Sequence, residues 1–441
     1  MYYDFKSIFK VTLPIFISIL ISQIIGITDV IFLGRVSTVA VGASGLGATC
    51  FFALFVIISG FAFGAQIMMS HRNGEQNYTK IGAVFYQGLF FLLMVSLILI
   101  GLSKFFLAQI LRHLIASNDV LHATVSYLNW RIFGLIATSF IVMFRSFFVS
   151  IAQTSALQIS SVFMLVSNIF LNYVLIFGHF GFSAHGIQGA AIASVISETI
   201  AVLTYFFYLL FQTDYIKYGF NRFVWRHFSL LKSILRISVW TTLQQFVSVV
   251  TWFLFFIAVE HLGETELAIS NILKNSAGIP WTVVLAFGIT ASTVTGNLIG
   301  ENKISEIIPA NKKIIRLNAF VLIFLLIVFA LFYYPILRLY TNDSNLITQS
   351  VYPYMTALLC YFPLFSGFIW FQSVSATGHT KYAMFIEFVS MILYLAFVGI
   401  VVLILKMPLY ICMFSDGVYN LVIYIMSRKF MLSLKWAQHI K

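Results

Sequence analysis

The stretch Val11–Gly34, VTLPIFISILISQIIGITDVIFLG, decides the class of this protein. Its apolar part is long enough to cross the ~30 Å hydrocarbon core of a bilayer as one helix. It is also longer than the ~7–15 apolar residues of a signal peptide and lacks a small-residue cleavage site, so we expect it to be retained as the first membrane span. Asp29 lies near its end. Because a carboxylate facing lipid is costly, something must hold Asp29 there.

The composition of the whole chain agrees with a membrane protein. Of its 441 residues, 61% are hydrophobic and only 9% are charged, whereas soluble domains carry roughly 25% charged residues. The net charge of +12 comes from basic residues between apolar runs, where they orient a membrane protein, so nucleic acid is not implied as a partner. The three cysteines lie in apolar stretches without disulfide or metal spacing, and we interpret them as packing residues.

Apolar runs of spanning length recur along the chain. They predict an all-α membrane protein with twelve transmembrane helices, near residues 11–33, 45–69, 81–102, 124–150, 156–178, 187–211, 235–259, 277–299, 315–336, 351–374, 382–405 and 410–427. The shorter amphipathic segment 103–118 is expected to lie at the membrane interface. Lys and Arg gather in the segments on the side of the N-terminus, which predicts a multi-pass protein of the plasma (inner) membrane with both termini cytoplasmic.

Short motifs recur at equivalent points between these helices. Two pairs are displaced by 226 residues and a third by 224: Gly74-Glu75 with Gly300-Glu301, Ile110-Leu111-Arg112 with Ile336-Leu337-Arg338, and Asn118-Asp119 with Asn342-Asp343. The repeat predicts two six-helix lobes, residues 1–211 and 235–441, joined by a cytoplasmic loop at 212–234. An even number of helices per lobe implies a pseudo-two-fold axis along the membrane normal and a cleft between the lobes.

Longer motifs carry a family resemblance. They are GASGLGATCFFALFVIISGFAFGAQIMMSHRNGE from Gly42, NIFLNYVLIFG from Asn168, HGIQGAAIASVISE from His185 and, in the second half, SATGHTKYAMF from Ser375. With the first span they resemble the multidrug and toxic compound extrusion (MATE) family, over most of the chain and in the family's order. The resemblance implies an efflux antiporter that exports cationic or amphipathic organic compounds in exchange for H+ or Na+ by alternating access.

Four acidic residues fall inside predicted spans, and each is a functional candidate by default. They are Asp29, Glu198, Glu387 and Asp416. The alternative is a structural hydrogen bond or an ion pair with Arg131 or Arg145, and we expect this of about half of them. Glu387 and Asp416 stand near the predicted starts of their helices, where they could be interfacial.

The resemblance implies that Asp29 belongs to a cation-binding site in the N-terminal lobe. Its partners in that family are matched by Asn168 and Asn172, which stand four residues apart on one helical face. Ser194 could add an oxygen, and Glu198 could lie on the same cavity or pair with an arginine. Carboxylate and amide oxygens suit Na+, and the same carboxylate can instead take a proton. No cofactor is expected beyond this coupling ion.

The second lobe departs from the family pattern. Alignment places Ser248 where relatives have a glutamate, and Ser366 or Gly367 where they have an aspartate. A carboxylate site in that lobe is therefore expected to be absent. Polar residues that could instead line the substrate cleft, or equally form core contacts, are Gln244, Gln245 and Glu387.

Other functions are less well supported. An intramembrane enzyme needs a cluster of His, Cys or acidic residues at one depth, and the nine histidines all fall in loops or at helix ends. A lipid-linked oligosaccharide flippase of the same superfamily is the main alternative, although it needs a cationic cavity for its pyrophosphate. A channel is disfavoured because no re-entrant pore motif is present. The family precedent is a monomer.

Overall fold

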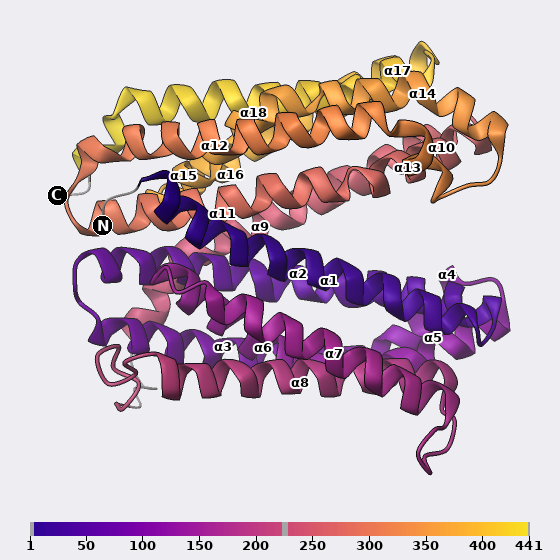
Figure 1. The fold of residues 1–441 in the computed structure, drawn as a ribbon, viewed down its shortest axis with the longest axis horizontal. Coiled ribbons are helices and arrows are strands. Elements are labelled where there is room, and N and C mark those ends of the chain that lie inside the picture. The colour runs from indigo at the N-terminus through magenta and orange to yellow at the C-terminus, as the bar shows by residue number, and fades with distance from the viewer. Residues whose placement is uncertain (1–3, 223–227, 440–441) are drawn as a thin grey trace. The chain divides into compact units, whose positions relative to one another are not determined.

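A computed structural model describes residues 4–222 and 228–439, and the regular structure of these residues is entirely helical (Figure 1). The first half contains α1 (Phe5–Gly34), α2 (Thr38–Gly74), α3 (Thr79–Leu102), the π-helical turn η1 (Ser103–Leu107), α4 (Ala108–Leu114), α5 (Asn118–Arg131), α6 (Gly134–Ser150), α7 (Ser155–Phe177) and α8 (Gly186–Gln212). The second contains α9 (Phe228–Glu260), α10 (Glu264–Ser276), α11 (Gly278–Gly300), α12 (Ile304–Leu331), α13 (Tyr333–Arg338), α14 (Ser344–Leu359), α15 (Tyr361–Ala376), α16 (Thr380–Val398), η2 (Gly399–Ile404), α17 (Leu409–Cys412), α18 (Phe414–Ser433) and the 3₁₀ turn η3 (Lys435–His439).

The described helices account for twelve membrane spans. Eleven are long and apolar enough to cross a bilayer, and the bent pair α5 and α6 makes the twelfth. This confirms the prediction of twelve transmembrane helices. Most of the segment 103–118 continues the third span through η1 and α4 as one helical stretch, Thr79–Leu114, and its position at the membrane interface stays a prediction. The fourth span is bent by 51° between Arg131 and Gly134, where the sequence predicted one helix over 124–150.

The two halves repeat each other in detail. Helix α2 spans Thr38–Gly74, and α10 with α11 spans Glu264–Gly300, so both limits are displaced by 226 residues. Each stretch is followed by a residue with left-handed backbone, Gln76 at φ 57° and Asn302 at φ 57°. Since Gln76 and Asn302 are also 226 residues apart, the repeat predicted from short motifs extends to backbone conformation.

The helices pack into two compact units whose limits fall inside helices. The N-terminal unit is residues 17–242, and the C-terminal unit is residues 1–16 together with 243–441. Helix α1 thus begins in the C-terminal unit and ends in the N-terminal unit, and α9 does the reverse. The predicted lobe limits, 1–211 and 235–441, refer to the sequence repeat and stay a prediction.

Specific contacts hold the two exchanged helix ends. In the C-terminal unit, the hydroxyls of Thr12 on α1 and Thr290 on α11 are 2.9 Å apart. In the N-terminal unit, Thr241 of α9 donates a 2.7 Å hydrogen bond to the carbonyl of Gly60 on α2. A Cβ at Gly60 would lie 2.5 Å from the Cα of Thr242. The glycine therefore permits backbone approach, as small residues do between membrane helices.

The connection between α8 and α9 is shorter than predicted. Helix α8 ends at Gln212 and α9 starts at Phe228, so the last part of the predicted loop 212–234 is helical, and residues 223–227 lie outside the described residues. The part that follows α8 packs on α3: the amide of Gly82 donates to the carbonyl of Tyr218 at 2.9 Å, and the Tyr86 hydroxyl donates to Phe220 at 2.8 Å. The loop is thereby fixed to the N-terminal unit.

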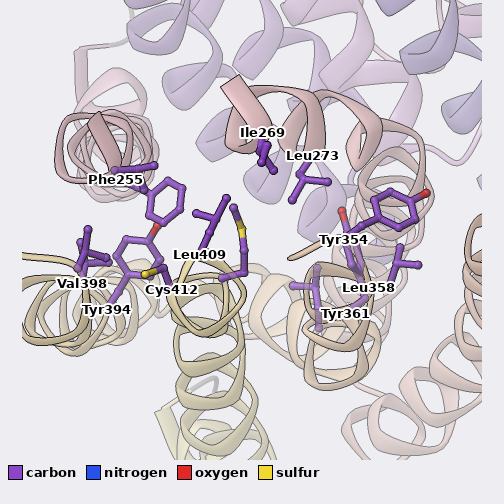
Figure 2. Packing of buried hydrophobic residues seen from close by; sticks show 14 of the residues in the cluster. Phe255, Ile269, Leu273, Tyr354, Leu358, Tyr361, Tyr394, Val398, Leu409 and Cys412 are labelled. Atoms are coloured by element: carbon purple, nitrogen blue, oxygen red, sulfur yellow. The ribbon is translucent and has the colours of Figure 1, made fainter. Parts of the chain in front are cut away.

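Large side chains fill the core of the C-terminal unit. Figure 2 shows Phe255 of α9, Tyr394 of α16 and Cys412 of α17 near one another, in a cluster that extends to α10, α14 and α15. The burial of Cys412 and Cys360, both free thiols, confirms them as packing residues, whereas Cys50 is partly exposed.

Candidate functional site

All four acidic residues predicted inside the membrane lie in described helices, two in each unit. Asp29 and Glu198 belong to the N-terminal unit, and Glu387 and Asp416 to the C-terminal unit. Two of the four, Glu198 and Asp416, form ion pairs with basic side chains. The other two contact neutral side chains, so the four separate into two kinds of site.

Asp29 lies on α1 against the two asparagines of α7. The side-chain amide of Asn172 donates to Asp29 Oδ1 at 2.6 Å and to Asn168 Oδ1 at 3.1 Å. The Ser194 hydroxyl of α8 is 3.5 Å from Asp29 Oδ2. Because residues four apart share one face of a helix, α7 presents both asparagines to the same place. The structure therefore brings together Asp29, Asn168, Asn172 and Ser194, and their role as a cation site stays a prediction.

Two polar atoms at this site have no hydrogen-bond partner among the described residues. They are Asn172 Oδ1 and Asn168 Nδ2, and both side chains are fully buried. A buried polar group without a partner costs about 1–3 kcal/mol, so such atoms usually serve a ligand or a water. The free carbonyl oxygen of Asn172 belongs to the same side chain that contacts Asp29. Carboxylate and amide oxygens beside each other form a donor set for a hard cation.

Glu198 has a separate role. Both of its carboxylate oxygens accept from Arg131, at 2.6 and 3.0 Å, and the side chains are only 13% (Arg131) and 14% (Glu198) exposed. The guanidinium also lies over the Phe51 ring, 3.6 Å from its centroid. The partner is therefore Arg131 and not Arg145, which forms no ion pair within the described chain. The charge of Arg131 also acts on Asp29, so the same guanidinium influences both carboxylates.

The bend in the fourth span makes room for this ion pair. A Cβ at Gly134, the first residue of α6, would lie 2.2 Å from Arg131 Nη1 and 2.7 Å from Glu198 Oε2. With hydrogen at this position, the guanidinium of Arg131 can fold across the start of α6 towards α8. The glycine and the bend thus position the arginine that selects Glu198.

Glu387 is buried within the protein, with 1% of the residue exposed. Ser248 of α9 donates to Glu387 Oε1 at 2.5 Å, and the Tyr419 hydroxyl of α18 donates to the same oxygen. Ser248 stands where the resemblance places a glutamate in relatives. The C-terminal unit therefore has a carboxylate next to that position, supplied by α16. Sequence reasoning missed this arrangement, and it missed Tyr419, one of many tyrosines in apolar runs.

Asp416 is neutralised by a lysine. Lys274 Nζ lies 2.5 Å from Asp416 Oδ2 and 4.8 Å from the centroid of the Phe255 ring, and its side chain is 9% exposed. The pair joins α10 to α18 within the C-terminal unit. It resembles Arg131 and Glu198 in combining a buried base, a carboxylate and an aromatic face.

Gln244 and Gln245, predicted to line the substrate cleft, both lie on α9. Gln244 is buried, and its Oε1 has no partner among the described residues, whereas Gln245 makes an interaction. Their role in a substrate cleft, with that of Glu387, stays a prediction. Within the described residues, no three His, Cys, Asp or Glu side chains are grouped as a metal site.

The chain is similar to known proteins over most of its length. The family model MatE matches residues 14–174 and again 241–401. A probable multidrug resistance protein NorM of Thermotoga maritima is 24% identical over 391 residues, covering 87% of this chain and 82% of the relative. A protein of the same description from Shewanella oneidensis is 23% identical over 347 residues, covering 78% and 74%.

Solved structures of similar fold cover nearly the whole chain. A transporter of the MOP superfamily from Pyrococcus furiosus, described as having a binding pocket of reverse polarity, superposes with a TM-score of 0.88 at 18% identity, covering 98% of this chain and 96% of that one. An outward-facing multidrug resistance transporter of the MATE family gives a TM-score of 0.89 at 18% identity, with the same coverage. At this level of identity, the likeness shows the fold.

Proposed function

Because the chain belongs to the MatE family, whose members are transporters and not enzymes, we propose that it is a secondary antiporter. It exports cationic or amphipathic organic compounds in exchange for H+ or Na+ by alternating access. The coupling cation binds at Asp29, with Asn168, Asn172 and Ser194 beside it. The protein works as a monomer in the plasma (inner) membrane, with both termini in the cytoplasm.

The state of Asp29 carries this proposal. None of the ion pairs among the described residues includes Asp29, and Arg131, the nearby base, already binds Glu198 with both ends of its guanidinium. The donor that remains at 2.6 Å is the neutral Asn172 amide. An ionised carboxylate at membrane depth is costly unless a cation accompanies it. Asp29 is therefore suited to exchanging one cation for another.

The single negative charge of Asp29 also explains why the coupling cation and the organic cation would be exchanged for each other. When H+ or Na+ occupies Asp29, the site is neutral, and it has little attraction for an organic cation. When the coupling cation leaves, the uncompensated carboxylate attracts the organic cation. Mutually exclusive binding of two cations at one negative charge makes their fluxes opposite.

The flippase alternative is less well supported by the charges. A pyrophosphate needs unpaired cationic side chains. Of the three basic side chains within or beside the predicted spans, Arg131 and Lys274 are paired with carboxylates. Arg145 forms no ion pair within the described residues, so one guanidinium of the three is left for a pyrophosphate.

Transport in proteoliposomes tests the proposal. Uptake of ethidium by reconstituted full-length protein should respond to an imposed H+ or Na+ gradient, each applied separately. Asp29→Asn keeps the shape and an acceptor for Asn172, and we expect it to reduce gradient-driven uptake at least about tenfold, since it removes the charge that both cations need. The control is Asp119→Asn, an exposed residue at the start of α5. Equal uptake by the Asp29 variant and the control would overturn the assignment.

A further inference from the structure

We infer that Glu387, together with Ser248 and Tyr419, forms a second binding site for a monovalent cation, H+ or Na+, in the C-terminal unit. The inference goes beyond the proposed function and rests on it in one respect, since it requires cation-coupled transport. It assigns to Glu387 a role different from lining the substrate cleft. It also places a site where the sequence comparison predicted the loss of one.

Three helices converge on one carboxylate: α16 carries Glu387, α9 carries Ser248 and α18 carries Tyr419. Within the described chain, both hydrogen bonds to Glu387 end on its Oε1. Two hydroxyl donors on one oxygen suit an ionised carboxylate and leave Oε2 as the atom that can take a proton or contact an ion.

The charge balance separates this site from a structural ion pair. Asp416, on the neighbouring helix, is compensated by Lys274 at 2.5 Å. Glu387 takes part in none of the ion pairs found in the described residues, although it is more deeply buried than Asp416. Buried charges in proteins are paired, neutralised by a proton or bound to an ion. With no base beside it, Glu387 is left with a proton or a bound cation.

The neighbouring groups fit a cation. A hydroxyl that donates to a carboxylate can rotate and offer its lone pairs to Na+ when the ion binds. Gln244 stands one helical turn before Ser248 on the same face of α9, and its buried Oε1 lacks a hydrogen-bond partner in the described part of the chain. This second, independent observation provides a neutral, unpartnered oxygen on the face of α9 that carries Ser248. Carboxylate, hydroxyl and amide oxygens together are hard ligands.

Two other titratable groups on the neighbouring helices have partners of their own. On α18, Asp416 is bound to Lys274. On α15, the Tyr361 hydroxyl donates to the carbonyl of Ala277 at 2.8 Å. On α16 itself, the ring of Tyr394 contacts that of Tyr419, with 6.1 Å between their centroids, and the buried Tyr394 hydroxyl has no hydrogen-bond partner among the described residues. Tyr419 is thus the titratable group that meets Glu387 directly, and the test must separate the two.

The test measures cations displaced by substrate. Ethidium is added to purified full-length protein in detergent, and released protons are counted with a pH indicator in weak buffer. A parallel arm counts displaced ²²Na+, so the two arms distinguish the two ions. Because linkage is reciprocal, ethidium binding must expel the cation that opposes it. The variants are Asp29→Asn, Glu387→Gln and both together, with Glu264→Gln, an exposed glutamate of α10, as the matched control.

We expect Glu387→Gln to displace about half as much cation per bound ethidium as wild type, since each carboxylate contributes one linked site. Asp29→Asn and the double variant should displace little, because the charge that ethidium needs is absent. If Glu387→Gln releases as much as wild type while Asp29→Asn releases none, the second site is overturned and the proposed function stands. If wild type displaces neither ion, both are overturned.

A second variant covers the case in which Glu387→Gln fails to fold. Tyr419→Phe keeps the carboxylate and removes one hydroxyl donor. We expect it to change the cation concentration at half-displacement by about threefold to tenfold, the usual effect of one hydrogen bond. A change in thermal stability with an unchanged midpoint would show a purely structural role and would overturn the inference.

Discussion

Each of the two units carries two of the four acidic residues predicted inside the membrane, and the units bind them with different side chains. Each has one carboxylate bound to a base, Glu198 with Arg131 and Asp416 with Lys274, and one held by neutral donors. In the N-terminal unit the donors are the Asn172 amide of α7 and, at 3.5 Å, the Ser194 hydroxyl of α8. In the C-terminal unit they are hydroxyls of α9 and α18. Burial alone therefore does not distinguish the two kinds of carboxylate. The nature of the partner side chain does.

The two halves of the sequence repeat share their helices but not the position of the carboxylate that is held by neutral donors. The residue displaced by 226 from Asp29 is Phe255, which is fully buried in the apolar cluster of the C-terminal unit (Figure 2). The carboxylate of that unit comes instead from α16, the helix equivalent to α7 in the repeat. Duplicated helices can thus keep their packing while the charged position moves to another helix.

The largest effect is expected from breaking the more buried ion pair. Glu198→Gln leaves Arg131 charged and uncompensated, and we expect it to lower the free energy of unfolding by about 3–5 kcal/mol, as removal of one partner of a buried pair does. Thermal unfolding in detergent measures this. Replacing Arg131 by Gln in the same chain should recover most of the loss. Asp29→Asn should cost far less, and an equal loss there would break the distinction between the two kinds of carboxylate.

The ion pair of the C-terminal unit should be weaker. Asp416→Asn leaves Lys274 without its partner, but the Asp416 side chain is 28% exposed, so water can partly compensate. We expect a loss of about 1–3 kcal/mol in the free energy of unfolding. Unfolding in detergent, compared directly with Glu198→Gln, checks the order. If the Asp416 variant lost more, exposure would not be what sets the difference between the pairs.

A smaller effect is expected at the bend that positions Arg131. Gly134→Ala puts a methyl group against the guanidinium, and we expect a loss of about 1–3 kcal/mol from overpacking. Gly26→Ala is the matched control, because a Cβ there meets nothing within 4 Å. Since alanine favours a helix over glycine, that variant should be neutral or stabilising by about 0.5–1 kcal/mol. Equal melting temperatures for the two would refute the positioning role of Gly134.

The smallest effect compares the repeated left-handed turns. Gln76→Gly should stabilise the N-terminal unit by about 0.5–1 kcal/mol, because glycine adopts positive φ without strain. Asn302→Gly should gain less, since asparagine tolerates that conformation better than glutamine. Differential melting of the two variants tests this, and a larger gain at Asn302 would contradict it.

Much of the fold could be predicted because hydropathy and basic residues report directly on the membrane. The position of Asp29 with Asn168 and Asn172 followed from the family resemblance together with helical spacing. The partners of Glu387 could not be predicted, because Ser248 lies 139 residues before it in the chain and Tyr419 lies 32 residues after it. Only the packing of three helices brings them together. The pairing of Glu198 with Arg131 could not be predicted either, because it depends on the bend between Arg131 and Gly134, where the sequence has no proline.

The exchange of helix ends has a consequence for synthesis. Residues 5–16 of α1 are made first, yet the unit in which they pack is completed by helices made much later, including α11 with Thr290. The N-terminal unit in turn needs the first turns of α9, which follow the connection after Gln212. A nascent chain stopped within that connection would therefore hold one unit without its last segment and one helix end without its neighbours. The N-terminal unit is therefore complete only after Thr242 has been translated, and the C-terminal unit joins the first residues of the chain to its last helices.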